Sequence, residues 1–432
     1  MSVSPDQIGS LIDRLLPVHR SQTGEGVRET LRMLREFDLD VRTKEVPSGT
    51  TCFDWEIPQE WRIRDAYIAD ESGQRIVDYK MSNLHVCNGS VPVDSLMTFD
   101  ELMPFLHASD HELDHPYRTV FFRDTWGFCI SRQQLQALQQ HNRLRVRIDS
   151  EYSDGSLTYG EAMLPGDSQD TVLMWTHICH PSLANDNVSG IATAACVYHQ
   201  LAEQKSRRLS YRFVFAPATI GAIAWLSQNQ NQLDAVYFAL VLTLLGDESG
   251  FNFKLTRSGD HFIDRCLRLV ENHDKRVEGI AEFDPSGYDE RQFSSPGIDL
   301  PAARITRSTP EQFPEYHTSG DNRGVISENR ILESASLVYC LLKMAEDNCL
   351  PVNTSPYCEP RLGPRGLFHA YGSGPSAAAD LHTSILWTLN LADGAHDALA
   401  ISERSGLPFD RIVEAIDRLQ QHGLIRKERA PF

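Results

Sequence analysis

The feature that most constrains the fold is a repeated order of strand and helix between about residues 151 and 345. Three short, almost continuously apolar runs cover residues 171–175, 211–216 and 236–245, and runs with helical periodicity separate them at 188–203 and 220–228. Apolar strands that alternate with helices are typical of a parallel or mixed sheet covered by helices on both faces. We therefore predict an α/β fold whose ligands bind beyond the carboxyl ends of the strands.

The segments before and after this core predict further parts. Residues 5–37 have a helical spacing of apolar side chains that is broken near residues 17–26. Residues 51–150 are rich in aromatic and β-branched side chains and turn signals, with one short helix expected near residues 99–106. We expect an inserted, mainly β domain at residues 51–150 and a catalytic domain formed by residues 1–50 and 151–350.

The last part of the chain predicts a separate small domain. A stretch rich in Pro, Gly and Ser covers residues 351–378 and is expected to be a linker. Three helical segments and a short strand follow, in the order of a winged helix-turn-helix. We expect that domain at residues 379–432.

Charge and cysteine content narrow the class of protein. Lys and Arg total 41 against 59 Asp and Glu, and the resulting net charge of -18 opposes binding to nucleic acid and to anionic lipid. The nine cysteines are odd in number and form no CxxC pair, so we interpret them as reduced thiols. Neither a signal-peptide pattern nor a membrane-spanning apolar run is present. We expect a cytoplasmic protein with no nucleic-acid or membrane partner, and a homo-oligomer remains an open alternative.

Four side chains are candidate metal ligands. His177 follows the first apolar strand, Asp186 lies where the next helix begins, Asp247 follows the third strand, and His317 lies in a polar, turn-rich segment. Zinc accepts imidazole nitrogen and carboxylate oxygen, and a catalytic zinc site keeps one position open for water. Two alternatives stay open. Asp186 could be a helix cap and not a metal ligand, and His180 competes with His177 for the same role. We favour His177, which is nearer the end of the strand.

Several longer segments resemble a known family. THICHPSLANDNVSGI, LLGDES, SGYDERQFSSPGIDLP and EYHTSGDN are similar to the signatures of a bacterial family of aminopeptidase-like proteins, often labelled polysaccharide-biosynthesis proteins, which is related to the zinc aminopeptidases and glutamate carboxypeptidase. WEIPQEWRIRDAYI, PYRTVFF and DGSLTYGE resemble its inserted β domain, and the terminal helices resemble its winged helix. The resemblance covers nearly the whole chain. It implies a zinc-aminopeptidase-like mixed sheet flanked by helices.

The resemblance also implies a ligand set. His177 and His317 correspond to imidazole ligands, Asp186 to the central carboxylate and Asp247 to a further metal carboxylate, and the peptide bond after Asp186 is expected to be cis. One departure is serious. Zinc aminopeptidases of this group carry a glutamate pair after the next strand, whereas this chain has FAPATIGA there, with Ala218 near the expected position. The loss of that carboxylate favours one zinc per chain over a pair.

Without that glutamate, the reaction needs another proton acceptor. We expect Glu290, in YDERQF, to act as the general base or as an anchor for a substrate ammonium group, with Tyr288 and Arg291 binding substrate. The alternative for Glu290 is a salt bridge with Arg291. Cys179 is a secondary ligand candidate, although buried cysteines near apolar strands are mostly inert.

The sequence thus predicts a zinc-dependent metallo-aminopeptidase-like hydrolase. It would cleave a terminal amide or peptide bond, in a small peptide or amide-containing metabolite, by metal-activated water. The main alternative is a catalytically silent or repurposed metal-binding relative in a polysaccharide or natural-product pathway. A DNA-binding regulator is less favoured, because acidic residues balance the basic ones in the third terminal helix.

Overall fold

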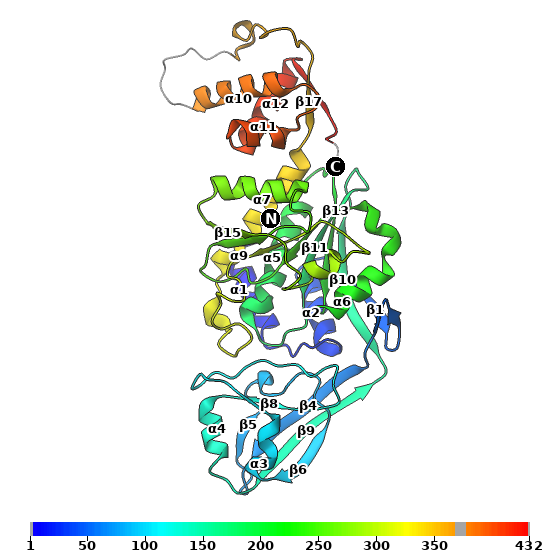
Figure 1. Ribbon diagram of the computed structural model, residues 1–432, viewed down its shortest axis with the longest axis vertical. Helices are drawn as coiled ribbons and strands as arrows, with labels where there is room; N and C mark the ends of the chain where they lie inside the picture. Colours follow the sequence, from blue (N-terminus) through cyan, green and yellow to red (C-terminus); the bar gives the residue numbers. More distant parts are fainter. Residues whose placement is uncertain (1–2, 368–376, 431–432) are drawn as a thin grey trace. The chain divides into compact units, whose positions relative to one another are not determined.

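The computed structural model describes residues 3–367 and 377–430. The chain divides into two compact units. The first consists of Met1–Gly259 and Ala281–Leu337, and the second of Asp260–Ile280 and Val338–Phe432. The residues expected to carry chemistry all lie in the first unit. Figure 1 shows the elements of each unit in chain order by colour.

A mixed sheet forms the centre of the first unit. Its order is β1 (Arg42–Pro47), β10 (Ser156–Leu164), β12 (Ser210–Ala216), β11 (Thr171–His177), β13 (Val236–Leu242), β16 (Ala302–Thr306) and β14 (Phe251–Lys254). The four strands β12, β11, β13 and β16 are parallel, whereas β1, β10 and β14 pair antiparallel with their neighbours. The predicted mixed sheet is therefore confirmed, and its parallel strands end at one edge.

Helices cover this sheet, as predicted, and Figure 1 shows α5 and α6 on opposite faces of it. The helices of this unit beside the sheet are α1 (Pro5–Leu15), α2 (Glu25–Glu36), α5 (Gly190–Ala202), α6 (Ile220–Gln228) and α8 (Glu290–Phe293). All seven residues of β11 are buried. Its side chains alternate between the two faces, and on one face Trp175 packs edge-on against Trp225 of α6 and Phe293 of α8. This packing fixes the strand that ends at His177.

The inserted segment is mainly β. Its sheet has the order β5 (Arg75–Asp78), β4 (Glu60–Ala69), β9 (Leu144–Ser153) and β6 (Val93–Met97), all antiparallel. Smaller elements are β2 (Thr51–Cys52), β3 (Trp55–Glu56), α3 (Phe99–Leu102), β7 (Leu106–Ala108) and β8 (Phe128–Ile130). The sequence missed a second helix, α4 (Arg132–Leu138), because Leu138 is its one buried residue and no apolar period marks it. A Ser131–Gln134 capping box starts this helix instead.

The second unit contains the winged helix. It includes α7 (Phe262–His273), β15 (Val277–Ala281), β17 (Leu350–Asn353), α10 (Ala377–Leu391), α11 (Ala398–Ser405), α12 (Phe409–Gln421) and β18 (Ile425–Glu428), and α9 (Glu328–Asp347) contains the boundary between the units. β17 pairs antiparallel with β18. The predicted order of three helices and a strand is confirmed.

The stretch expected to be a linker is structured in part. Residues 351–353 belong to β17, and the side chains of Leu362 and Leu367 are buried in the core of the winged helix. Proline and glycine content alone could not reveal these contacts, because they depend on partners in later segments of the chain. Residues 368–376 of the expected linker lie outside the described residues.

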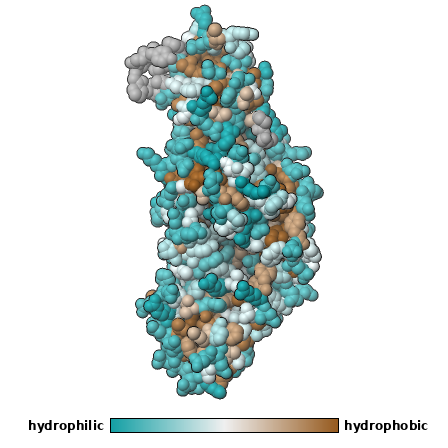
Figure 2. Space-filling view, viewed as in Figure 1, coloured by the Kyte–Doolittle hydropathy of each residue, from teal (hydrophilic) through white to brown (hydrophobic). Residues whose placement is uncertain are grey.

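The visible surface is mainly hydrophilic, with scattered hydrophobic patches, as Figure 2 shows. Exposed aromatic side chains include Phe53, Trp55 and Phe122. Within the described residues, no helix has both the length and the apolar character needed to cross a membrane.

Candidate metal centre

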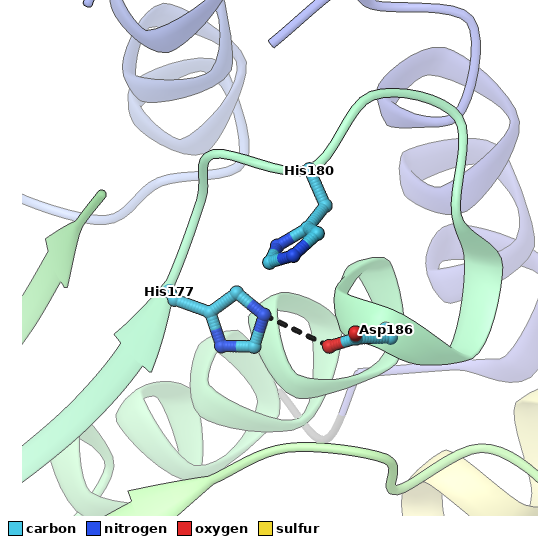
Figure 3. Close-up of side chains that lie close together, drawn as sticks. All are labelled: His177, His180 and Asp186. Carbon is cyan, nitrogen blue, oxygen red and sulfur yellow. Dashed lines mark hydrogen bonds and ion pairs between the residues drawn. The ribbon is translucent and has the colours of Figure 1, made fainter. Parts of the chain in front are cut away.

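His177, His180 and Asp186 lie together where β11 ends. Figure 3 shows His177 at the last residue of the strand, His180 on the loop that follows, and Asp186 at the start of the helical segment that leads into α5. Both imidazole rings and the carboxylate face one space. The peptide bond between Asp186 and Asn187 is cis, which confirms the expectation from the family resemblance.

Asp186 is shared by two histidines from distant parts of the chain. Nε2 of His177 lies 2.9 Å from one carboxylate oxygen of Asp186, and Nε2 of His317 lies 3.0 Å from the other. Asp186 is fully buried and His177 is 1% exposed. Burial opposes the ionisation of Asp186, but His180 and His177 outweigh it and hold the pKa of this carboxyl well below its usual range. The carboxylate is therefore charged and enclosed by imidazoles.

Two atoms of this group have no partner other than each other. Nε2 of His317 and Oδ2 of Asp186 lie 3.0 Å apart, and neither has a further partner among the described residues, although both atoms are buried. An unpaired buried polar atom is costly unless a ligand or ion satisfies it. Two ligands of one tetrahedral zinc, each about 2.1 Å from the metal, lie roughly 3.4 Å apart. The 3.0 Å separation, and the absence of a further partner for either atom among the described residues, are therefore compatible with zinc held between His317 and Asp186.

His180 belongs to the same group, so the choice between His177 and His180 does not exclude either residue. Within the described part of the chain, ligand atoms of His177, His180 and Asp186 lie within 4.8 Å of one another. Burial lowers the pKa of His180 well below its usual value, so its imidazole is neutral at physiological pH. Neutral imidazole is the form that binds metal.

A second buried acid, Asp321, holds the loop that carries Asp186. Its two carboxylate oxygens accept hydrogen bonds from the backbone amides of Asn185 and Asp186, at 2.6 and 2.8 Å. Burial raises the pKa of Asp321 to about 8. The sequence prediction missed this residue, although it lies only four positions after His317 in EYHTSGDN. No local pattern marks it, because its partners lie some 135 residues earlier.

Asp247 lies outside the group of three close ligands. One of its carboxylate oxygens accepts hydrogen bonds from the Asn185 side chain and from the Ser308 hydroxyl, both at 2.6 Å, and the other accepts from the backbone amide of Ser249 at 2.8 Å. Because Asn185 precedes Asp186, Asp247 is linked to the same loop. Its role as a ligand stays a prediction.

Glu290 is buried, but its partners differ from the expected one. Its Oε1 lies 3.3 Å from Nζ of Lys254 and 3.3 Å from Nη1 of Arg304, so the salt bridge expected with Arg291 is replaced by two buried ones. Its Oε2 has no hydrogen-bond partner among the described residues. The sequence suggested Arg291 because it is adjacent in the chain, whereas Lys254 and Arg304 come from β14 and β16.

The two residues expected to bind substrate lie on either side of Glu290. The ring of Tyr288 stacks on His177, with centroids 5.3 Å apart and an interplanar angle of 21°. Burial raises the pKa of Tyr288 well above its usual value, so its hydroxyl is neutral. Arg291 is half-buried, and its Nε has no hydrogen-bond partner among the described residues. Tyr288 therefore contacts the candidate centre directly, whereas substrate binding by either residue stays a prediction.

Ala218 lies at the same edge of the sheet as His177. His177 is paired with Ala216 across the two parallel strands, and Ala218 follows two residues later. Its amide donates to Sγ of Cys179 at 3.2 Å. Burial raises the pKa of Cys179 to about 12, so the thiol stays protonated in this geometry. The turn after β12 thus presents a methyl group at the position where a glutamate was expected.

Asp289 is a further buried acid next to this turn that the sequence prediction missed. Its carboxylate accepts hydrogen bonds from the backbone amide of Thr219 and from the Trp175 indole, both at 2.7 Å. Thr219 has a φ of 64°, an uncommon conformation for a β-branched residue. The hydrogen bond from its amide to Asp289 helps to hold the turn that carries Ala218.

Comparisons with known proteins agree with this architecture. A family model described as a domain of unknown function (DUF4910) matches residues 9–348, and one described as a winged helix-turn-helix matches residues 349–427. A Clostridium acetobutylicum protein, named as a polysaccharide biosynthesis protein with an aminopeptidase-like domain, is 40% identical over 421 residues, which cover 97% of this chain and 96% of the relative.

Solved structures extend the comparison. A crystal structure from Clostridium acetobutylicum, of a protein named as a peptidase, matches with a TM-score of 0.92 and 38% identity over 98% of this chain and 96% of that one. A zinc aminopeptidase from Bacillus subtilis matches with a TM-score of 0.58 and 15% identity over 79% of this chain and 95% of its own. The second likeness shows the fold alone. The chain therefore belongs to the DUF4910 family of bacterial aminopeptidase-like proteins and carries that family's fold together with a C-terminal winged helix.

Proposed function

We propose that the protein is a zinc-dependent, aminopeptidase-like hydrolase that cleaves a terminal amide or peptide bond. The observation that carries this proposal is the carboxylate of Asp186, which is approached by His177 on one oxygen and by His317 on the other. A buried, charged carboxylate between two imidazoles from separate segments suits a cation, and Nε2 of His317 has no other partner among the described residues.

Several residues of this chain would have distinct roles in holding the metal. His177, Asp186 and His317 would hold one zinc, with His180 as a further nitrogen donor. Asp247 would be the further carboxylate ligand, and the hydrogen bonds from Asn185 and Ser308 would orient it as a ligating carboxylate requires. When bound, zinc polarises a carbonyl and lowers the pKa of water.

The substrate proposed is a small peptide or an amide-containing metabolite. The name of the Clostridium acetobutylicum relative suggests a setting in polysaccharide biosynthesis, in which an amide on a sugar intermediate is a candidate beside a peptide. A cytoplasmic location and self-association remain predictions.

A second candidate is a relative that binds zinc without hydrolysis. Two observations favour it. Ala218 supplies no carboxylate at the turn after β12, and Glu290, the expected replacement, is neutralised by Lys254 and Arg304. Both cations contact Oε1 of Glu290, so that oxygen is already engaged in ion pairs.

The two candidates can be separated with the variant Ala218→Glu. If the centre is competent but lacks a base, Ala218→Glu raises the turnover of an aminoacyl p-nitroanilide, on the order of 100-fold, because a positioned base contributes about 10²–10⁴-fold. Ala218→Gln is the matched control, since it adds the same bulk without a base. Zinc content is measured for each variant.

The outcomes lead to different conclusions. Turnover by the native chain, raised further in Ala218→Glu and unchanged in Ala218→Gln, supports the hydrolase. Absence of turnover in all three proteins, with zinc bound in each, contradicts the hydrolase and supports the binding protein.

A further inference from the structure

A hollow in the inserted β domain lies outside the candidate metal centre. Residues 118–123 and His107 line it, and its volume is about 550 Å³. We call it the 118–123 pocket. Binding sites for small molecules commonly have volumes of about 300–1,000 Å³, so the 118–123 pocket has room for a small organic ligand.

The charged side chains of this pocket are all basic. Arg118 and Arg123 are exposed, and no Asp or Glu is among the lining residues. Within the described chain, neither arginine forms an ion pair, whereas surface arginines such as Arg28 and Arg330 each contact two or more carboxylates. A hydrogen bond with Cys87 raises the pKa of His107. A chain with a net charge of -18 thus has a local excess of basic side chains at this pocket.

Apart from Thr119, the remaining wall of the pocket is apolar and aromatic. Val120 and Phe121 are buried, whereas Phe122 is 54% exposed. The Phe122 ring also contacts Trp55 edge-on, with centroids 5.5 Å apart, and Trp55 is 39% exposed. Exposed aromatic rings beside arginines offer a surface to a ring-shaped ligand and leave the guanidinium groups free for its charged group.

The backbone of the pocket is held in place by a neighbouring turn. The amide of Asn88 donates to the carbonyl of Arg118 at 3.0 Å, and the amide of Val120 donates to the carbonyl of Asn88 at 2.8 Å. Gly89 has a φ of 85°, and a Cβ at that residue would lie 2.4 Å from Cα of Phe121. Glycine is therefore required for this close approach, and the pocket wall is a fixed surface.

We propose that the 118–123 pocket binds a small ligand in which a phosphate or carboxylate is attached to a ring-shaped, largely apolar body. Arg118 and Arg123 would bind the anion, because the planar guanidinium matches both oxyanions with paired hydrogen bonds. Phe121 and Phe122 would contact the ring.

The same segment reaches the candidate metal centre. Tyr117 immediately precedes the pocket, and its amide donates to the carbonyl of His317 at 2.7 Å. Its ring contacts the imidazoles of His180 and His317, with centroid distances of 5.1 and 5.3 Å. A ligand in the pocket would therefore lie one residue from a side chain that packs on the centre, but the proposal itself does not depend on hydrolysis or on zinc.

Calorimetric titration of the full-length protein tests this proposal. The probes are phenyl phosphate, benzoate and inorganic phosphate, with phenol as the uncharged control. We expect saturable binding of phenyl phosphate, benzoate or both, at least tenfold weaker in the double variant Arg118→Gln, Arg123→Gln. Arg143→Gln, which changes an exposed arginine elsewhere in the same domain, is the matched control and should bind as the native chain does.

Each outcome bears on the proposal. Binding of phenyl phosphate alone identifies a phosphate ligand, and binding of benzoate alone identifies a carboxylate ligand. If inorganic phosphate bound with the same affinity as phenyl phosphate, the ring would contribute nothing to binding, which would contradict the proposed contact with Phe121 and Phe122. Absence of saturable binding by both aromatic anions, or affinity unchanged in the double variant, would overturn it. Both side chains are on the surface, so we expect the variants to fold. Thermal unfolding of each variant checks this.

Discussion

At the scale of single residues, Asp186 has the central position in the candidate metal centre. Two imidazoles contact its two oxygens, and Asp321 holds its backbone amide. His317 reaches it from a left-handed conformation with a φ of 53°, which is uncommon outside glycine and tends to persist where the surroundings enforce it. These contacts position the groups for a cation before one binds.

We expect the main effect of replacing Glu290 to be a loss of folding stability. Replacing it with Gln leaves Arg304 without its buried carboxylate partner, and leaves Lys254, which is 1% exposed, with only the exposed carboxylate of Asp284 at 3.2 Å. We expect Glu290→Gln to lower the free energy of unfolding by about 3 kcal/mol, since breaking a buried ion pair leaves an uncompensated charge. Urea unfolding measures this change.

Glu248→Gln is the control for that experiment. Glu248 is 73% exposed and pairs with Arg330 at the surface, so its loss should cost less than about 1 kcal/mol. If Glu290→Gln kept full stability and zinc but lost turnover, Glu290 would instead have the proton-transfer role that the sequence suggested.

At the scale of the elements, the loop between β11 and α5 depends on Asp321. Asp321→Ala would leave the amides of Asn185 and Asp186 without their acceptors. Residues that orient metal ligands typically contribute about 10–100-fold to metal affinity, and we expect a loss of zinc affinity in that range. Competition with a chelator of known zinc affinity measures it.

Asn322→Ala is the matched control for Asp321→Ala. Asn322 is the next residue, it is exposed, and its side chain accepts from the amide of Gly324 at 2.9 Å. The zinc affinity of Asn322→Ala should equal that of the native chain. Unchanged affinity in Asp321→Ala as well would mean that the loop holds its shape without this acid.

The elements also show which parts of the structure local sequence patterns can predict. The apolar runs of β11, β12 and β13 are nearly continuous, so these strands were predicted. His177 and Asp186 were then chosen because they lie at and after the carboxyl end of β11. The role of Asp321 and the partners of Glu290 depend on segments distant in the chain. Local periodicity does not contain that information, and it also missed α4 and the strand β17.

At the scale of the whole molecule, charge argues against a nucleic-acid partner. The net charge is -18, and in α12 both arginines are paired, Arg411 with Glu414 at 3.0 Å and Arg418 with the same carboxylate group at 3.6 Å. Few free cations are left on that helix for phosphate. We therefore expect the winged helix to have a protein-interaction or lid role.

The division of the chain into two units is a second feature of the whole molecule. The second unit takes in α7 as well as the winged helix, because Arg265 of α7 pairs with Asp397 and Glu403. The domain boundaries expected from the sequence do not anticipate that grouping, since Arg265 lies 132 and 138 residues before its two partners. The candidate metal centre lies within the first unit.

The most direct test of the account is the zinc content of purified protein, measured by elemental analysis. We compare the native chain with His177→Ala, His317→Ala and the exposed control His111→Ala. We expect about one zinc per chain in the native protein and in His111→Ala, and almost none in the other two variants, because each removes a nitrogen donor from a site with few ligands. No zinc in the native chain after incubation with zinc salts, or zinc retained in both His177→Ala and His317→Ala, would contradict it.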